Sequence, residues 1–256
     1  MDPTPDLFQP SASGPPSPER WNRILPIERA AAALEVAVCS GFPTQLVVVT
    51  VLTTFGMKVR LADGSLSSNF VFALTLIDTI LVIGLVLFFL RAHRESAREL
   101  LLGSRPIGRE ALFGIGLIPA SFGVVITVLF LVQIVMPSLR NVPHNPLQDL
   151  VHSRRDAVLF ALVVMIAGGV REEIQRAFVL RRFEQYLGGA AVGLAIFSVL
   201  FGLGHVEQGY DVMLATMVLG AFWGAIYLRR RSVVGPMVGH AGFNLAQVVK
   251  FLTIGG

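Results

Sequence analysis

The chain carries three short polar motifs on segments that are otherwise apolar. They are Glu172-Glu173 with Arg176, Phe201 with His205, and His240 with Asn244. An ionisable side chain at membrane depth costs about 2.5 to 3.5 kcal/mol on insertion scales, so it faces a bundle interior or a water-filled cavity. These motifs are therefore the first candidates for a functional site.

A glutamate, two histidines and an asparagine that converge suit water-mediated attack on a carbonyl carbon. The carboxylate takes a proton from water, one imidazole orients the water, and imidazole and amide donors stabilise the oxyanion. The same side chains leave another use open, a zinc ion held by Glu172, His205 and His240. Spacing alone does not decide between these uses. The amide of Asn244 suits an oxyanion better than zinc, so we expect no tightly bound metal.

Each motif also has a purely structural interpretation. Glu172 and Glu173 lie four and three residues before Arg176, which also suits an interfacial charge cluster at a helix end. A single histidine in a helix is more often a hydrogen-bonded core residue than a catalyst, but here there are two. Two adjacent carboxylates beneath the uncharged run 157–170 need a cavity to be solvated, and this favours the functional interpretation.

The composition predicts a membrane protein. Hydrophobic residues make up 54% of the chain and charged residues only 15%, which lies outside the range of ordinary soluble domains. Residues 111–136 carry no charge and residues 71–90 only Asp78, and each run can cross a bilayer core of roughly 20 residues. Further apolar runs are about 30–57, 156–176, 189–206, 211–228 and 232–252. The sequence thus predicts an all-α, polytopic integral membrane bundle of about seven transmembrane helices, the first interrupted at Gly41-Phe42-Pro43.

The segments outside these spans predict the organisation of the chain. Residues 1–20 predict a disordered N-terminal tail, and residues 21–256 a single helical membrane domain. The proline-containing segment 137–155 is the longest loop on its side, and we expect it to cover a cavity mouth. The net charge is +4, but the basic residues lie at helix ends instead of forming a stripe, so no nucleic-acid partner is expected.

The motifs and their order resemble the CAAX protease and bacteriocin-processing family of intramembrane endopeptidases, which includes the type II CAAX prenyl endopeptidases. That family carries E-E-x-x-x-R, F-x-x-x-H and H-x-x-x-N on successive core helices. Phe201 to His205 fits the second motif, and His240-Ala-Gly-Phe-Asn244 fits the third, within a protease-like core at about 155–250. In the first motif Arg176 arrives one residue early, giving E-E-x-x-R.

The resemblance implies roles for six residues and a function. The residues are Glu172 and His205 for activating water, His240 and Asn244 for the oxyanion, and Glu173 and Arg176 in support. We further expect Glu172 to pair with Arg176 along one helix face, with Glu173 reaching Arg176 only from the side. The implied function is an intramembrane endopeptidase that acts on a membrane protein or peptide in the lipid bilayer. The alternative is a non-catalytic membrane scaffold, regulator or immunity protein with the same cavity. Substrate identity, substrate prenylation and oligomeric state do not follow from the sequence.

The distribution of Lys and Arg predicts the orientation in the membrane. With seven spans, one side carries thirteen of them: Arg20, Arg23, Arg29, Arg91, Arg94, Arg98, Arg105, Arg109, Arg181, Arg182, Arg229, Arg230 and Arg231. The other side carries six: Lys58, Arg60, Arg140, Arg154, Arg155 and Lys250. The N-terminus is therefore expected in the cytoplasm and the C-terminus outside. Reporter fusions should place residue 256 outside and residue 100 inside, whereas the opposite result would mean that a span is miscounted.

Overall fold

The computed structural model describes residues 24–143 and 146–254. These residues form helices, and the one β-type contact among them is an isolated bridge between Arg60 and Leu66. The α-helices are α2 (Pro26–Val38), α3 (Phe42–Thr54), α4 (Ser68–Ala92), α5 (Ala97–Leu101), α6 (Ile107–Val135), α7 (Arg154–Val163), α8 (Glu172–Tyr186), α9 (Ala190–Leu203), α10 (Tyr210–Arg230) and α11 (Val234–Ile254). A π-helix, η3 (Val164–Arg171), joins α7 to α8. Short 3₁₀ turns are η1 (Pro137–Leu139), η2 (Gln148–Leu150) and η4 (Val206–Gln208). The predicted all-α class is confirmed, and the predicted tail 1–20 lies outside the described residues.

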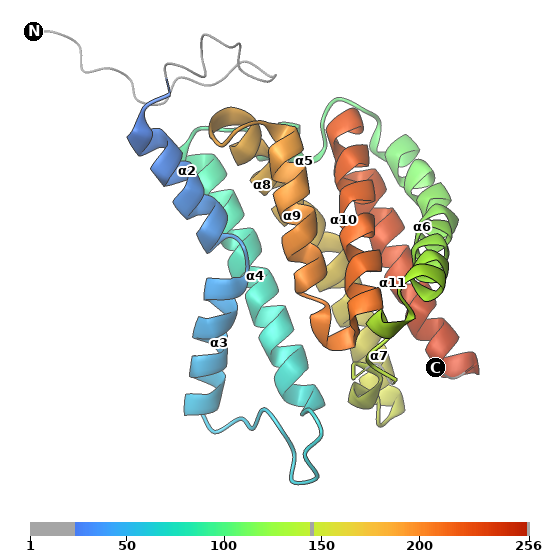
Figure 1. Cartoon of the computed structure of the whole chain (residues 1–256). Helices are drawn as coiled ribbons and strands as arrows, with labels where there is room; N and C mark the ends of the chain where they lie inside the picture. Colours follow the sequence, from blue (N-terminus) through green and yellow to red (C-terminus); the bar gives the residue numbers. More distant parts are fainter. Residues whose placement is uncertain (1–23, 144–145, 255–256) are drawn as a thin grey trace, which may run out of the picture.

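The longer helices run alternately up and down, so that successive connections lie at opposite ends of the bundle (Figure 1). By length and composition, α4, α6 and α10 can each cross a membrane, and α2 with α3 can form a fourth, bent span. α9 is apolar but shorter. These helices are those of an integral membrane protein, while the count of seven spans stays a prediction.

The first predicted span is broken where the sequence indicates. α2 ends at Val38, α3 begins at Phe42, and their axes differ by 44°. Gly41 supplies the left-handed conformation at this bend, with φ of +89°. Pro43 lies in the first turn of α3, where a missing N–H leaves no hydrogen bond unmade.

Two other predicted spans have different ends in the structure. The span 156–176 continues to Tyr186 through α7, η3 and α8, so Glu172-Glu173 lies inside a long helical segment and not at its end. The span 189–206 is too long, because α9 ends at Leu203 and His205 follows it in the turn before η4. A hydrophobicity pattern locates the apolar run but does not show which residue completes the last helical turn.

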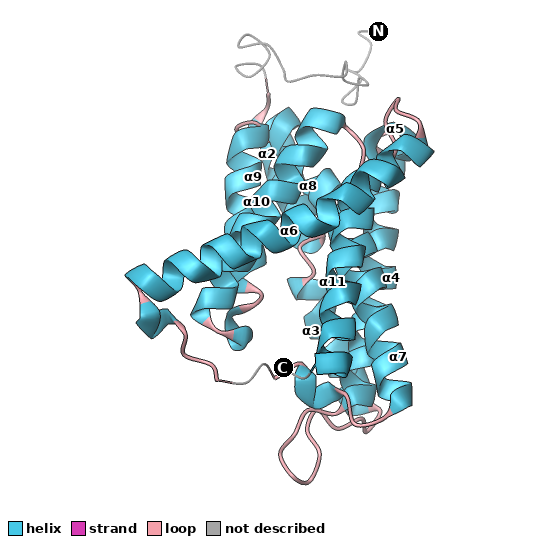
Figure 2. Cartoon of the chain, turned by 90° about the vertical axis from the view of Figure 1, so that its right-hand side faces the viewer, coloured by secondary structure: helices cyan, strands magenta, loops and turns pink. Residues whose placement is uncertain are grey.

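Close contact between α6 and α11 positions one side of the site. α6 crosses the bundle obliquely and lies against α11 (Figure 2). Glycines make this contact possible, because a Cβ on Gly114 would lie 2.6 Å from the Gly235 carbonyl oxygen, and one on Gly239 would lie 2.8 Å from the Leu117 Cβ. Small residues of this kind let helix backbones approach closely in membranes.

The α6 to α11 contact can be tested with two alanine substitutions on α6. We expect Gly114→Ala to lower the stability by about 1 to 3 kcal/mol, because backbone atoms of α11 must move to accept the methyl group. Gly116 has no neighbouring atom within 4 Å of the equivalent Cβ. Gly116→Ala should therefore be neutral or stabilising by about 0.5 to 1 kcal/mol, through helix propensity alone. Thermal unfolding of the purified protein in detergent measures both, and equal effects would contradict this packing.

Candidate active site

A cavity of about 490 Å³ opens among α4, α6, α7, η3, α10 and α11. Its polar lining includes Glu172 at the start of α8, His205 after α9, and His240 with Asn244 on α11. Apolar side chains of α4, α6, α7 and α10 form most of the remaining wall. The polar groups thus lie together in a cavity of an otherwise apolar bundle, and facing this cavity spares them the cost of losing their hydration.

The π-helix η3 directs Glu172 into this cavity. A π-helix closes i to i+5 hydrogen bonds, so it holds one extra residue per turn and rotates the helix that follows. Gly168 and Gly169 face α11 within η3, and a Cβ on Gly169 would lie 2.8 Å from the Ala241 Cα. At this close approach the Asn244 amide donates a hydrogen bond to the Val164 carbonyl oxygen over 3.2 Å. One amide hydrogen of Asn244 is then left for another acceptor in the cavity.

Behind the cavity wall lies a buried ion pair between Glu173 and Arg176. The Arg176 side chain is fully buried and that of Glu173 is 1% exposed. The same Glu173 oxygen lies 2.9 Å from Nδ1 of His240. An ionised carboxylate only accepts hydrogen bonds, so Nδ1 carries a proton and donates it to Glu173, and this contact leaves Nε2 available to another group. Glu173 thereby fixes both the tautomer and the orientation of His240.

Aromatic rings complete the surroundings of this ion pair. The Trp223 ring stacks on the His240 ring with centroids 3.7 Å apart, and its indole N–H donates to Ser121 over 3.2 Å. The Arg176 guanidinium carbon lies 5.1 Å from the Phe197 ring centroid and 5.2 Å from that of Phe201. Such cation–π contacts stabilise a desolvated cation. They also connect α8 to α9.

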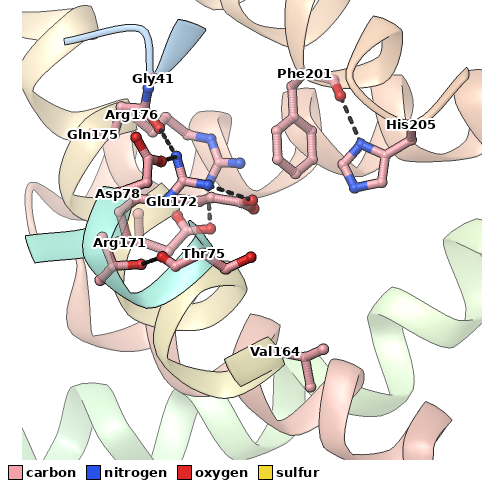
Figure 3. Close-up of polar contacts among 12 residues, drawn as sticks. Gly41, Thr75, Asp78, Val164, Arg171, Glu172, Gln175, Arg176, Phe201 and His205 are labelled. Carbon is pink, nitrogen blue, oxygen red and sulfur yellow. Dashed lines mark hydrogen bonds and ion pairs between the residues drawn. The ribbon is translucent and has the colours of Figure 1, made fainter. Parts of the chain in front are cut away.

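His205 is oriented by the helix that it follows. Its Nδ1 lies 2.8 Å from the Phe201 carbonyl oxygen, as Figure 3 shows. A carbonyl accepts only, so Nδ1 is the donor, and Nε2 of the neutral ring is an acceptor. His205 is therefore prepared to accept a hydrogen bond from water at Nε2.

Glu172 sits next to a second charged cluster, which reaches α3 and α4 (Figure 3). One guanidinium nitrogen of Arg171 lies 3.5 Å from a Glu172 oxygen, and the other lies 3.6 Å from an Asp78 oxygen. The Thr44 hydroxyl donates to Asp78 as well. Arg171 thus divides its charge between two carboxylates, and Asp78 bonds to neighbouring helices through Thr44 and Arg171.

The structure brings together four of the six predicted site residues in one cavity. These are Glu172, His205, His240 and Asn244. The ring centroid of Phe201 lies 5.1 Å from that of His205 and 6.1 Å from that of His240, so the two imidazoles are at most 11.2 Å apart, the sum of these distances. The Glu172 carboxylate lies 3.8 Å from Nε2 of His240.

The other two predicted residues, Glu173 and Arg176, are buried behind the cavity. The prediction that Glu172 pairs with Arg176 is wrong. Arg176 pairs with Glu173, three residues away, and not with Glu172. Both spacings place side chains side by side on a helix, and the rotation of α8 after η3 decides between them. Glu172 is thereby left free to face the cavity.

Several residues of the site were missed by the sequence analysis. Arg171 follows an uncharged run, where a charged residue is typical of a helix end, and Trp223 lies in an apolar stretch with no polar neighbour. Only the intramembrane position of Asp78 was a usable signal. Leu147 and Leu150, in the loop before α7, line the cavity, while the expectation that this loop covers a cavity mouth stays a prediction.

The described residues do not fit a metal site. Among them, no three His, Cys, Asp or Glu side chains stand close enough together to hold one metal ion. Glu172 is also engaged by Arg171, whose guanidinium nitrogen lies 3.5 Å from its carboxylate. The arrangement of Glu172, His205 and His240 is thus not that of three zinc ligands at bonding distance.

Comparison with known proteins supports a protease. Residues 154–246 match the family model described as type II CAAX prenyl endopeptidase, Rce1-like. This segment runs from the start of α7 into α11 and contains all six predicted site residues. The resemblance seen in the sequence is confirmed over this segment, which indicates a protease type of function in an integral membrane protein. Comparison with curated proteins and with solved structures gives no match.

The buried pair can be tested with a double-mutant cycle. Removing one partner leaves an uncompensated buried charge, so Glu173→Gln and Arg176→Met should each lower the stability by about 3 to 5 kcal/mol. The double variant should lose less than the sum of the two, with a coupling of about 0.5 to 3 kcal/mol. Unfolding in detergent measures all four proteins. Additive losses would contradict a direct interaction between Glu173 and Arg176.

Proposed function

We propose that the chain, whose residues 154–246 match the type II CAAX prenyl endopeptidase family, is an intramembrane endopeptidase. It hydrolyses a peptide bond in a membrane protein or membrane-bound peptide. One observation carries the proposal: Glu172, His205, His240 and Asn244 come from three separate segments and line one cavity of an apolar bundle. If these polar side chains faced the lipid, they would lose their hydration at a cost in free energy that no function would explain.

Glu172 and His205 activate the attacking water. The Glu172 carboxylate takes one proton from the water, while Nε2 of His205 accepts a hydrogen bond from it and fixes its direction. The hydroxide oxygen then bonds to the carbonyl carbon of the substrate. When the C–N bond breaks, the protonated Glu172 returns its proton to the leaving amine, so that the carboxylate is regenerated.

His240 and Asn244 stabilise the negative charge that develops on the carbonyl oxygen. The free amide hydrogen of Asn244 is one donor. Protonated His240 is the other, through Nε2, and its positive charge is balanced by the Glu173 carboxylate, 2.9 Å from Nδ1. Glu173 and Arg176 are positioning residues, because they hold His240 without facing the cavity.

No step of this mechanism uses a metal. The proton transfers and the oxyanion contacts are supplied by carboxylate, imidazole and amide groups. The amide of Asn244 is not one of the usual zinc ligands, which are Cys, His and carboxylate.

A non-catalytic membrane scaffold is the second candidate, and one observation favours it. Arg171 lies 3.5 Å from the Glu172 carboxylate and forms an ion pair with it, so this side chain already has a charged partner within the protein. A scaffold would keep the same cavity and bind the same membrane partner without cleaving it.

The roles of the two glutamates can be separated by amide substitutions. Glu172→Gln keeps the shape of the side chain but cannot accept the proton, so we expect cleavage to fall by about 10² to 10⁴-fold. Glu173→Gln should retain measurable activity, because Glu173 acts only through His240 and Arg176. The measurement is quantitative mass spectrometry of peptides released from membranes that contain each variant.

Glu207→Gln serves as the matched control, because Glu207 is an exposed acid in η4 and lies outside the cavity lining. It should release peptides as the unchanged protein does. If Glu172→Gln also does so, the scaffold function replaces the protease. If Glu173→Gln alone abolishes release, Glu173 is the base.

A further inference from the structure

Arg171 connects the carboxylate of Glu172 to a second, buried carboxylate. Its Nη2 lies 3.5 Å from Oε1 of Glu172, and its Nη1 lies 3.6 Å from Oδ2 of Asp78 on α4. The other Asp78 oxygen accepts a hydrogen bond from the Thr44 hydroxyl in the first turn of α3. Asp78 is 2% exposed, so protein groups and not solvent stabilise its charge. The guanidinium of Arg171 is thereby anchored to α4 while it reaches Glu172.

The contact with Arg171 orients the carboxylate of Glu172. Oε1 is the oxygen that lies beside Arg171, whereas Oε2 lies 3.8 Å from Nε2 of His240, which lines the cavity. A carboxylate that is held at one oxygen presents the other oxygen in a defined direction. Proton transfer from water requires the accepting oxygen to lie within hydrogen-bond distance of that water. The position of Arg171 therefore sets the position of the oxygen that reacts.

The bend between α2 and α3 packs against the same guanidinium (Figure 3). Nη1 of Arg171 donates to Oε1 of Gln175 over 3.3 Å, and Nε2 of Gln175 donates to the Cys39 carbonyl oxygen over 2.6 Å. A Cβ on Gly41 would lie 3.2 Å from Nη1 of Arg171. A side chain at position 41 therefore requires Arg171 to shift, so the glycine of the bend leaves room for the guanidinium.

We infer that Asp78 and Arg171 are positioning residues of the site. Asp78 holds Arg171, and Arg171 holds the Glu172 carboxylate where it takes a proton from the attacking water. The inference rests on the proposed protease function. Asp78 and the bend at Gly41 lie outside residues 154–246, so the helices before the matched segment contribute to the placement of the base.

A double-substitution cycle on activity tests the two positioning residues. Arg171→Gln removes the cation and Asp78→Asn removes its anchor. We expect each to lower peptide release per folded molecule by about 10 to 100-fold, because a small misplacement of a reacting group has effects of this size. The double variant should release as much peptide as Arg171→Gln alone, since Asp78 acts only through Arg171. Arg171→Lys keeps a cation between the two carboxylates and should release more peptide than Arg171→Gln.

Release is measured by quantitative mass spectrometry, and the folded amount by size-exclusion chromatography in detergent. Higher release from Arg171→Gln overturns the inference, because Arg171 would then restrain the base instead of positioning it. Losses that multiply in the double variant overturn it, because Asp78 would then act independently of Arg171. Equal release from Arg171→Lys and Arg171→Gln overturns it as well, because the cation would then have no role.

Arg230→Gln is the control for the loss of a buried ion pair elsewhere in the bundle. Arg230 donates two hydrogen bonds to the buried Glu110, at 2.6 and 2.8 Å, and neither residue lines the cavity. This variant should lose stability, since it leaves the Glu110 carboxylate without its partner. Its peptide release per folded molecule should stay that of the unchanged protein.

A matched pair of glycines tests the contribution of the bend. Gly41 and Gly56 have similar φ angles, +89° and +85°, so alanine is strained at both. Among the described residues, no atom lies within 4 Å of a Cβ on Gly56, whereas a Cβ on Gly41 meets Arg171. Gly41→Ala should therefore lower peptide release per folded molecule, and Gly56→Ala should not. Equal release from the two variants would show that the bend does not act through Arg171.

The inference and the proposed function fail in different ways. Only peptides whose release stops in Glu172→Gln are counted in these measurements. If such peptides are found, and their release is unchanged in Arg171→Gln and in Asp78→Asn, the inference is wrong and the protease stands. If no peptide depends on Glu172, the protease is wrong, and the inference is wrong with it.

Discussion

The site depends on keeping one buried cation, Arg176, paired inside an apolar bundle. Desolvating a guanidinium costs several kcal/mol, and only a well-oriented carboxylate together with aromatic faces offsets this. Glu173 supplies the carboxylate, and Phe197, Phe201 and Trp223 lie around the cation. Because Glu173 also bonds to His240, the requirement to neutralise Arg176 fixes an imidazole at the cavity wall. The relative placement of α8, α9, α10 and α11 follows from this one requirement.

The same constraint separates the two adjacent glutamates. Successive residues on a helix point about 100° apart, so once Glu173 faces Arg176, Glu172 must face elsewhere. The π-helix before α8 sets the rotation at which that direction is the cavity. One carboxylate is thus immobilised as part of the scaffold, and its neighbour meets the solvent in the cavity, beside Arg171. Two adjacent glutamates therefore have different surroundings, although their side chains are chemically identical.

Part of this arrangement could be predicted from the sequence. His205, His240 and Asn244 stand out because polar groups are expensive in apolar helices, and Gly41-Phe42-Pro43 indicates a break because of its backbone preferences. The partner of Arg176 could not be predicted, since residues three and four apart both lie beside it. The π-helix has no compositional signal, and it depends on how Gly168 and Gly169 pack against α11. Trp223 was missed because an aromatic residue in an apolar run gives no sign that it will stack on His240.

The Glu173–Arg176 ion pair also explains how the first motif can be one residue shorter than the family pattern. In the pattern E-E-x-x-x-R, the second glutamate lies four residues before the arginine, whereas here Glu173 lies three residues before Arg176. Both separations put the two side chains on the same face, so losing one residue preserves the pair between the second glutamate and the arginine. What changes is the rotation of the first glutamate and of the residue before it, relative to the rest of α8. Arg171 then reaches both Glu172 and Asp78, so the shorter motif is expected to affect the charge around the base more than the placement of His240.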